Sequence, residues 1–195
     1  MPATARKITP ADILSDSDYT AQRKALRSEA IALKKRRRVE VGPYATFYFE
    51  NYQTMWLQVQ EMLRIEKGGK EQIAGELETY NPLIPQGDEL IATLMLEIED
   101  AMRRHATLLT LGGIEETIFM EIGGTRIVAT PTEYDDRTTA DGKTSSVHWL
   151  RFKLTPELVA RFNTERVVLG IDHKNYGHMA VLSDDTRAAL TRDFN

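Results

Sequence analysis

Short connections between segments of strand periodicity are the feature that most constrains the fold of this chain. Residues 117–122 and 125–130 alternate between apolar and polar side chains, and two consecutive glycines separate them, which is a hairpin signal. Residues 166–171 and 179–182 are also joined by a short link. Parallel strands need crossovers of a dozen residues or more, so links of this length favour antiparallel pairing. We therefore predict an α+β fold with a single, mainly antiparallel sheet of about six to seven strands.

The same periodicities predict the remaining elements. Asn51 fits the N-cap of a helix with a broad apolar stripe around Trp56. The side chains of residues 89–99 alternate between two faces, which predicts a long strand. A helix is the alternative, because Leu, Met and Glu favour helices. Residues 133–145 lack apolar periodicity and predict a long exposed loop. Further strands are expected at 45–50 and 146–154, and helices at 18–38, 52–67, 70–79, 101–111, 156–163 and 184–193.

Charge is distributed unevenly along the chain. Residues 1–38 carry ten Lys or Arg and four Asp or Glu, whereas the complete chain carries 25 and 29 and has a net charge of -4. We predict one α+β domain, in which residues 1–38 form a basic helical arm and residues 39–195 an acidic body. The arm ends in five consecutive cations, residues 34–38.

Two kinds of partner could use this basic run. Clustered cations bind phosphate backbones, but no aromatic residue is interleaved to stack on bases, so we do not expect nucleic acid binding. Cations in the last turn of a helix complement its dipole. The acidic body could also receive the arm, within the chain or across a homodimer.

Composition excludes several classes of chemistry. The chain has no cysteine, which removes disulfides, thiolate catalysis and an iron–sulfur cluster held by cysteine. The first ten residues are polar, and no apolar run reaches the length of a membrane helix. We expect a cytoplasmic protein without a membrane partner. Phosphate-binding loops, nucleophile elbows and metalloprotease motifs do not occur.

Histidines offer a candidate metal site. His148 falls on an apolar strand face, where a hydrogen-bonded core histidine is the main alternative to a ligand. His173 and His178 flank a loop with Asp172 and Tyr176 between them, and such a loop could fold around a divalent cation. A divalent metal is therefore the cofactor to consider, with His148, His173 and His178 as candidate ligands.

One face of the helix predicted at residues 52–67 carries uncharged polar side chains beside a carboxylate. Asn51, Thr54, Gln58 and Glu61 fall within about 80° of arc at the period of an α-helix. Donors and acceptors of this kind suit a polar ligand or an internally satisfied network. A proline-stiffened turn should return toward the same face. We predict a ligand-binding pocket formed by six side chains: Glu50, Asn51, Gln58, Glu61, Tyr80 and Asn81.

This pocket has no obvious nucleophile. Any catalysis there would be general acid–base chemistry by Glu50 or Glu61. The alternative is a hydrogen-bonded lock between helix and turn without a ligand.

Several segments resemble a bacterial family of uncharacterised proteins. They are Phe49-Glu50-Asn51, Gln58-Val59-Gln60-Glu61-Met62-Leu63-Arg64, Tyr80-Asn81-Pro82-Leu83-Ile84-Pro85, Val147-His148-Trp149-Leu150-Arg151-Phe152, and His173 with Tyr176. From about Arg36 onward the chain resembles domain of unknown function 3501. Members are encoded beside rubrerythrin-like and iron–sulfur proteins, so the resemblance implies a role near redox metabolism and a partner of that kind. The residues and the resemblance together predict a small-ligand- or metal-binding protein that could be an enzyme. A non-catalytic accessory or interaction module is the alternative.

Overall fold

Nine strands form two antiparallel sheets in the part of the chain that the computed structural model describes, residues 6–132 and 138–194. The five-stranded sheet has the order β1-β2-β3-β7-β6, and the four-stranded sheet has the order β5-β4-β8-β9. The strands of the first sheet are β1 (Arg38–Val41), β2 (Ala45–Phe49), β3 (Glu89–Leu96), β6 (Thr130–Pro131) and β7 (Val147–Lys153). Those of the second are β4 (Ile118–Ile122), β5 (Thr125–Val128), β8 (Val167–His173) and β9 (Tyr176–Val181).

The α+β class and the antiparallel pairing agree with the sequence, but the prediction of a single sheet of about six to seven strands is wrong. Alternation identifies which side chains of a strand face the core, and it carries no information about which strand is the hydrogen-bonded neighbour. Here β4 does not continue the sheet that contains β3. It begins a second sheet, and buried side chains of the two sheets, such as Leu94 and Met120, share one apolar core.

The basic arm is also shorter as a helix than predicted. Helix α1 (Asp16–Lys35) ends before Arg38, which begins β1 and pairs with Tyr48 of β2. The strand predicted at residues 89–99 is confirmed over Glu89–Leu96. In the predicted exposed loop at 133–145, residues 133–137 lie outside the described residues. Thr144 is buried and forms an isolated bridge with Thr138, so this end of the loop is not exposed.

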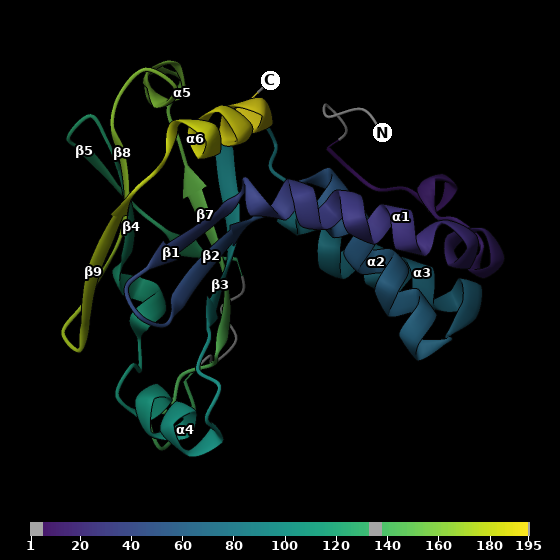
Figure 1. Ribbon diagram of the computed structural model, residues 1–195, viewed down its shortest axis with the longest axis horizontal. Helices are drawn as coiled ribbons and strands as arrows, with labels where there is room; N and C mark the ends of the chain where they lie inside the picture. Colours follow the sequence, from purple (N-terminus) through teal and green to yellow (C-terminus); the bar gives the residue numbers. More distant parts are fainter. Residues whose placement is uncertain (1–5, 133–137, 195) are drawn as a thin grey trace.

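Three helices pack against a small part of the five-stranded sheet, around Ile91, and project to one side of the two sheets (Figure 1). They are α1, α2 (Tyr52–Glu66) and α3 (Gly69–Tyr80). Strand β3 is shared between two apolar clusters, because Leu90 and Ala92 face the core between the sheets and Ile91 faces the helices. The other helices are α4 (Ala101–Leu109), α5 (Pro156–Phe162) and α6 (Asp184–Thr191).

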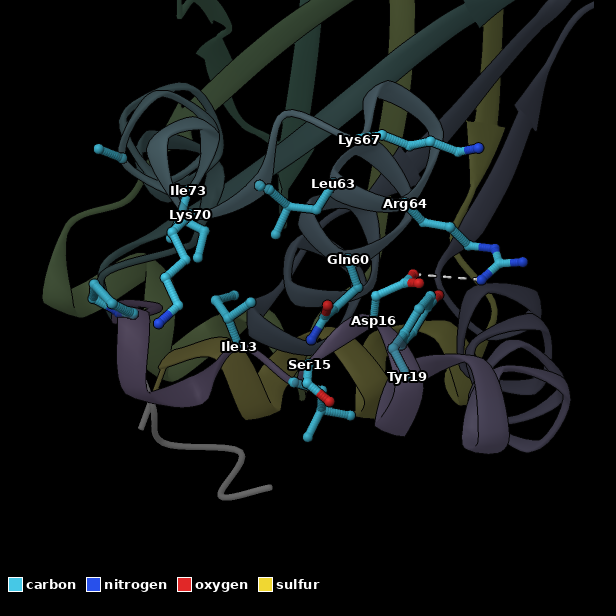
Figure 2. A pocket seen from close by; sticks show the side chains of 14 residues that line it. Ile13, Ser15, Asp16, Tyr19, Gln60, Leu63, Arg64, Lys67, Lys70 and Ile73 are labelled. Atoms are coloured by element: carbon cyan, nitrogen blue, oxygen red, sulfur yellow. Dashed lines mark ion pairs between the residues drawn. The ribbon is translucent and has the colours of Figure 1, made fainter.

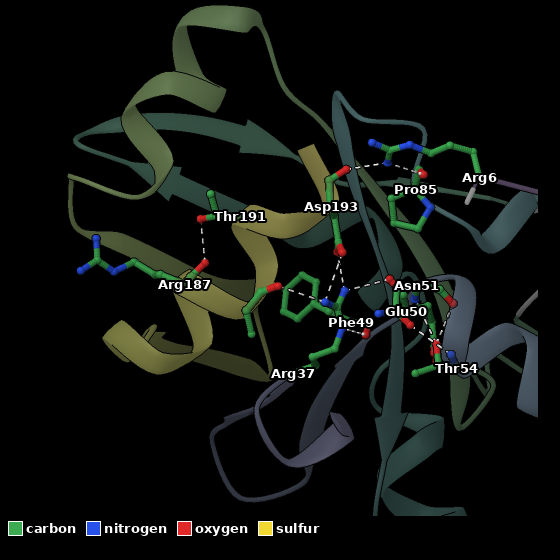
Figure 3. A network of polar contacts seen from close by, with 11 residues as sticks. Arg6, Arg37, Phe49, Glu50, Asn51, Thr54, Pro85, Arg187, Thr191 and Asp193 are labelled. Carbon is green, nitrogen blue, oxygen red and sulfur yellow. Dashed lines mark hydrogen bonds and ion pairs between the residues drawn. The ribbon is translucent and has the colours of Figure 1, made fainter. Parts of the chain in front are cut away.

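A buried ion pair joins the end of the basic run to the C-terminal segment. The Arg37 side chain is 2% exposed and donates hydrogen bonds to both carboxylate oxygens of Asp193. It also donates to the backbone oxygens of Phe49, Glu50 and Ala189 (Figure 3). Arg37, one cation of the basic run, therefore forms its contacts inside the folded chain. No helix within residues 6–132 and 138–194 is both long and apolar enough to cross a membrane.

Candidate functional site

A groove of about 1130 Å³ lies between the start of α1, the second half of α2 and the first turns of α3 (Figure 2). Local sequence signals place the two walls formed by α2 and α3. Asn51 caps α2, because its Oδ1 accepts a hydrogen bond from the backbone of Thr54. Lys67 follows α2 as its C-cap and has a left-handed conformation, with φ of 54°. Two glycines follow, and α3 begins at the second of them.

The third wall is the segment that leads into α1, and two side-chain contacts hold it. The indole nitrogen of Trp56 donates to the backbone oxygen of Asp12 at 2.8 Å. The Asn81 carboxamide accepts from the backbone nitrogen of Ile8 at 2.7 Å and donates to its oxygen at 3.0 Å. Residues from α2 and from the turn after α3 thus fix the approach to α1.

The lining is mainly apolar and has one buried carboxamide. Ile13, Leu14, Leu63 and Ile73 supply the apolar surface. Gln60 is 2% exposed, and its Nε2 has no hydrogen-bond partner among the described residues. Figure 2 shows the Gln60 carboxamide directed between α2 and the segment that leads into α1. Burying an amide without a partner costs about 1–3 kcal/mol, so this position is costly for the folded chain alone.

The charged side chains of the lining are spread around the groove, and Figure 2 shows Lys67 and Lys70 extending to opposite sides of it. Arg64, Lys67 and Lys70 line the groove, and Asp16 is the one acidic side chain among the lining residues. Asp16 Oδ1 lies 3.6 Å from a guanidinium nitrogen of Arg64. Arg64 also donates to the hydroxyl of Thr20. Arg64 therefore bridges α2 and α1, whereas neither lysine forms an ion pair within the described residues.

Glu61 lies behind the groove and fixes one of its walls. Its carboxylate accepts from the hydroxyl of Tyr19, which lines the groove, and from Arg23 at 2.8 Å on each oxygen. The hydrogen bond from Arg23 is the main cause that lowers the pKa of Glu61 to about 2. Burial, followed by the hydrogen bond to Glu61, raises the pKa of Tyr19. At neutral pH the pair is therefore a carboxylate and a protonated phenol.

The six predicted pocket residues are divided among separate contacts. Gln58 and Tyr80 come together, at 3.5 Å between Nε2 and the phenol oxygen. Glu61 contacts α1, while Asn51 caps α2 and Asn81 holds Ile8, as described above.

Glu50 faces the five-stranded sheet. It is buried and accepts from the Thr93 hydroxyl at 2.7 Å, and no hydrogen-bond partner of its second carboxylate oxygen lies in the part of the chain that the structure describes. Figure 3 places Glu50 and Asn51 beside the Arg37 network. Of the six residues, Glu61 contacts a lining side chain, Tyr19, and Asn81 holds the segment that leads into α1.

The three candidate metal-ligating histidines lie on different strands. His148 on β7 is buried, with Nε2 2.9 Å from the backbone oxygen of Ser145. His173 ends β8, and its Nε2 lies 3.3 Å from the backbone oxygen of Gly112. His178 on β9 stacks edge-on against Tyr176. Among the described residues, no group of three or more His, Cys, Asp or Glu side chains could hold a metal ion.

The groove residues were not predicted from the sequence, although Gln60 carries a signal. It follows Trp56 by four residues and therefore lies on the same side of α2, at the margin of the apolar stripe. A carboxamide at such a position is either satisfied within the fold or turned toward a ligand. Lys67 and Lys70 lie on either side of a glycine pair that the sequence marks only as a helix break.

Comparisons with known proteins place the chain among uncharacterised relatives. A model of the family described as "Protein of unknown function (DUF3501)" matches residues 7–194. A crystal structure of a novel protein of unknown function from Burkholderia pseudomallei K96243 is 34% identical, with a TM-score of 0.89. The alignment covers 97% of this chain and 100% of that chain. No curated protein matches. The homodimer and the redox-related partner stay predictions.

Proposed function

Because this chain belongs to the DUF3501 family, whose function is unknown, we propose a function from the geometry of the groove. The chain binds a small organic molecule in the groove between α1, α2 and α3. The volume of about 1130 Å³ is slightly above the range common for ligand pockets, about 300–1,000 Å³. Mainly apolar walls with few polar groups are also typical of such pockets.

The observation that carries this proposal is the Gln60 carboxamide. A leucine at this position would bury apolar surface without an unsatisfied amide, so the fold alone gives no reason for a glutamine. An acceptor on a bound molecule would satisfy Nε2 and recover that cost. Ligand binding therefore accounts for a group that residues 6–132 and 138–194 leave without a partner.

The lining supports binding rather than catalysis. It contains no histidine, and its one acidic side chain, Asp16, is paired with Arg64. Glu61 enters the proposal as a positioning residue that holds Tyr19 in the wall, in place of the acid–base role predicted for it.

An uncharged fluorophore tests the proposal. We expect N-phenylnaphthylamine to bind the purified full-length chain saturably, with an increase in emission. Ala74 lines the groove and is exposed, so Ala74→Trp should fill the space and weaken binding by about tenfold or more, which is about 1.4 kcal/mol.

Ala25→Trp is the matched control. Ala25 is an exposed residue of α1 that does not line the groove, and the same substitution there should leave the affinity unchanged. Absence of saturable binding to the wild-type chain contradicts the proposal. Equal affinities of the Ala74→Trp and wild-type chains contradict it as well, because the fluorophore would then be bound elsewhere.

A further inference from the structure

Two hydroxyl groups that line the groove already donate their protons to carboxylates of the protein. The Ser15 hydroxyl, at the N-cap of α1, donates to the carboxylate of Asp18 at 2.7 Å. The Tyr19 hydroxyl donates to Glu61, which holds it in the wall of the groove. A ligand that took either proton would break a contact that shapes the groove. Neither hydroxyl is therefore the donor that a ligand meets first.

The charged side chains of the lining lie at its exposed margin. The Asp16 side chain is 80% exposed and faces Arg64, which is 36% exposed. Lys67 and Lys70 are exposed as well, and Figure 2 shows them on opposite sides of the groove, so they do not converge on one ligand group. The buried Nε2 of Gln60, by contrast, lies among apolar side chains. The deep part of the groove therefore offers a ligand one amide donor and no charge.

A carbonyl oxygen suits this donor better than other acceptors. It accepts a hydrogen bond and has no proton of its own. A hydroxyl or an amine can accept the same bond, but each brings an O–H or N–H group that needs a further acceptor when it is buried. A carboxylate or an ammonium group would lose its hydration against apolar walls without a counter-ion beside it. The surroundings of Gln60 thus select an uncharged acceptor without a proton.

We propose that the ligand is an uncharged, mainly apolar molecule that carries a carbonyl oxygen, as a ketone does. The carbonyl accepts from Nε2 of Gln60, and the apolar body packs on Ile13, Leu63 and Ile73. Those three side chains come from the segment before α1, from α2 and from α3, so the body contacts all three walls. This inference rests on the proposed function, because it names the class of molecule bound at the same site.

Two probes of nearly the same shape test the inference. 2-Acetylnaphthalene and 2-ethylnaphthalene differ by a carbonyl oxygen in place of two hydrogens, and each is titrated against bound N-phenylnaphthylamine. Water solvates the ketone better than the hydrocarbon, so the ratio of their affinities is compared between the wild-type and Gln60→Leu chains. We expect Gln60→Leu to lower the ratio of ketone to hydrocarbon affinity by about tenfold, because it removes the donor.

Gln58→Leu is the matched control. It is the same substitution two residues earlier on α2, at a glutamine that does not line the groove, and it should leave the ratio unchanged. Gln60→Met, which keeps an unbranched side chain, should lower the ratio as Gln60→Leu does. Both Gln60 variants should still bind the fluorophore, which shows that the groove is folded.

The outcomes separate this inference from the proposed function. If the ratio is the same in the wild-type and Gln60 variants, the carbonyl assignment is overturned and the proposed function stands. An equal fall in Gln58→Leu overturns the assignment too, because the effect would not come from the Gln60 donor. Loss of fluorophore binding in both Gln60 variants contradicts it as well, because the carboxamide would then hold the wall. Failure of the wild-type chain to bind the fluorophore overturns both proposals.

Two further probes with the same ring system test the class of ligand. 1-(2-Naphthyl)ethanol has a hydroxyl in place of the carbonyl, and 2-naphthoate has a carboxylate. We expect the ketone to bind the wild-type chain about threefold more tightly than the alcohol and about tenfold more tightly than the carboxylate. Binding of 2-naphthoate as tightly as the ketone contradicts the uncharged class. Binding of the alcohol as tightly as the ketone contradicts the restriction to a carbonyl.

Discussion

Removal of the Asp193 charge should destabilise the protein strongly, because Arg37 would remain buried without its counter-ion. Arg37 is 2% exposed and Asp193 is 7% exposed. Removing one partner of a buried ion pair costs about 3–5 kcal/mol in the free energy of unfolding, mainly because an uncompensated charge is left behind. We therefore expect Asp193→Asn to lower the free energy of unfolding by about 3–5 kcal/mol.

The pair itself should contribute much less than this loss. Taking the carboxylate and the guanidinium out of water costs free energy, and this cost offsets much of their mutual attraction. The double variant Arg37→Met, Asp193→Leu should consequently lose less than the sum of the two single losses.

Urea denaturation of the wild-type, Arg37→Met, Asp193→Leu and double-variant chains at neutral pH, with m-values compared, measures this double-mutant cycle, and Asp193→Asn is measured beside them. Arg38→Met is the control from the same basic run. The Arg38 side chain is 43% exposed and its ion pair with Glu40 is on the surface, so the loss should be below about 1 kcal/mol. A loss below about 1 kcal/mol for Asp193→Asn would refute the reasoning, since the Arg37 charge would then be tolerated alone.

Three further substitutions have predictable effects on stability. Glu61→Gln should lower the free energy of unfolding by about 1–3 kcal/mol at neutral pH. Folding lowers the pKa of Glu61 from 4.5 to about 2, so urea titrations should show this difference from wild type disappearing as the pH falls through that interval. Gln60→Leu should raise the free energy of unfolding by about 1 kcal/mol, because it removes an unsatisfied buried amide. A loss of stability in calorimetry would show that the Gln60 amide has a partner in the folded chain. Gly170→Ala should cost about 1–3 kcal/mol, because its Cβ would lie 2.2 Å from the Phe119 ring, and a thermal midpoint equal to wild type would refute the overlap.

A helix or strand could be predicted from the sequence where its cap residues and its apolar periodicity lie within its own residues. The cap at Asn51 and the stripe around Trp56 specify α2 without reference to the rest of the chain. Strand β3 alternates over its whole length, and its apolar residues are buried on both faces. Arg38 lies in five consecutive cations that resemble the end of a helix, and only its pairing with Tyr48 shows that it begins a strand. The division into two sheets likewise depends on pairing partners.

The candidate site could be predicted only in part, because tertiary contacts build it. Polar periodicity selected Gln58 and Glu61, which lie on the sides of α2 that contact Tyr80 and α1. Gln60 belongs to the side that forms the groove. The wall opposite Gln60 exists because Trp56 holds Asp12 at a separation of 44 residues, and no local pattern encodes that contact.

A final prediction separates fold-maintaining residues from site residues among those that match the family. The Tyr176 hydroxyl accepts from the backbone nitrogens of Tyr44 and Ala45, each at 2.9 Å, and donates to the Val41 oxygen at 2.8 Å. Burial raises the pKa of Tyr176, so this hydroxyl keeps the proton that it donates. It therefore joins β9 to the turn between β1 and β2, across the two sheets.

Removal of that single oxygen should have a large effect on stability. Tyr176→Phe leaves three backbone groups without their partner, and we expect a loss of about 3 kcal/mol in the free energy of unfolding. For a chain of this length that corresponds to a fall of about 6–12 °C in the thermal midpoint. Tyr48→Phe removes an exposed hydrogen bond to Glu97 and should cost less than about 1 kcal/mol. Fluorophore affinity should be the same in both variants, because Tyr176 lies between the sheets and the groove is formed by helices. If Tyr176→Phe kept its stability and lost binding, Tyr176 would belong to the site and the groove assignment would be wrong.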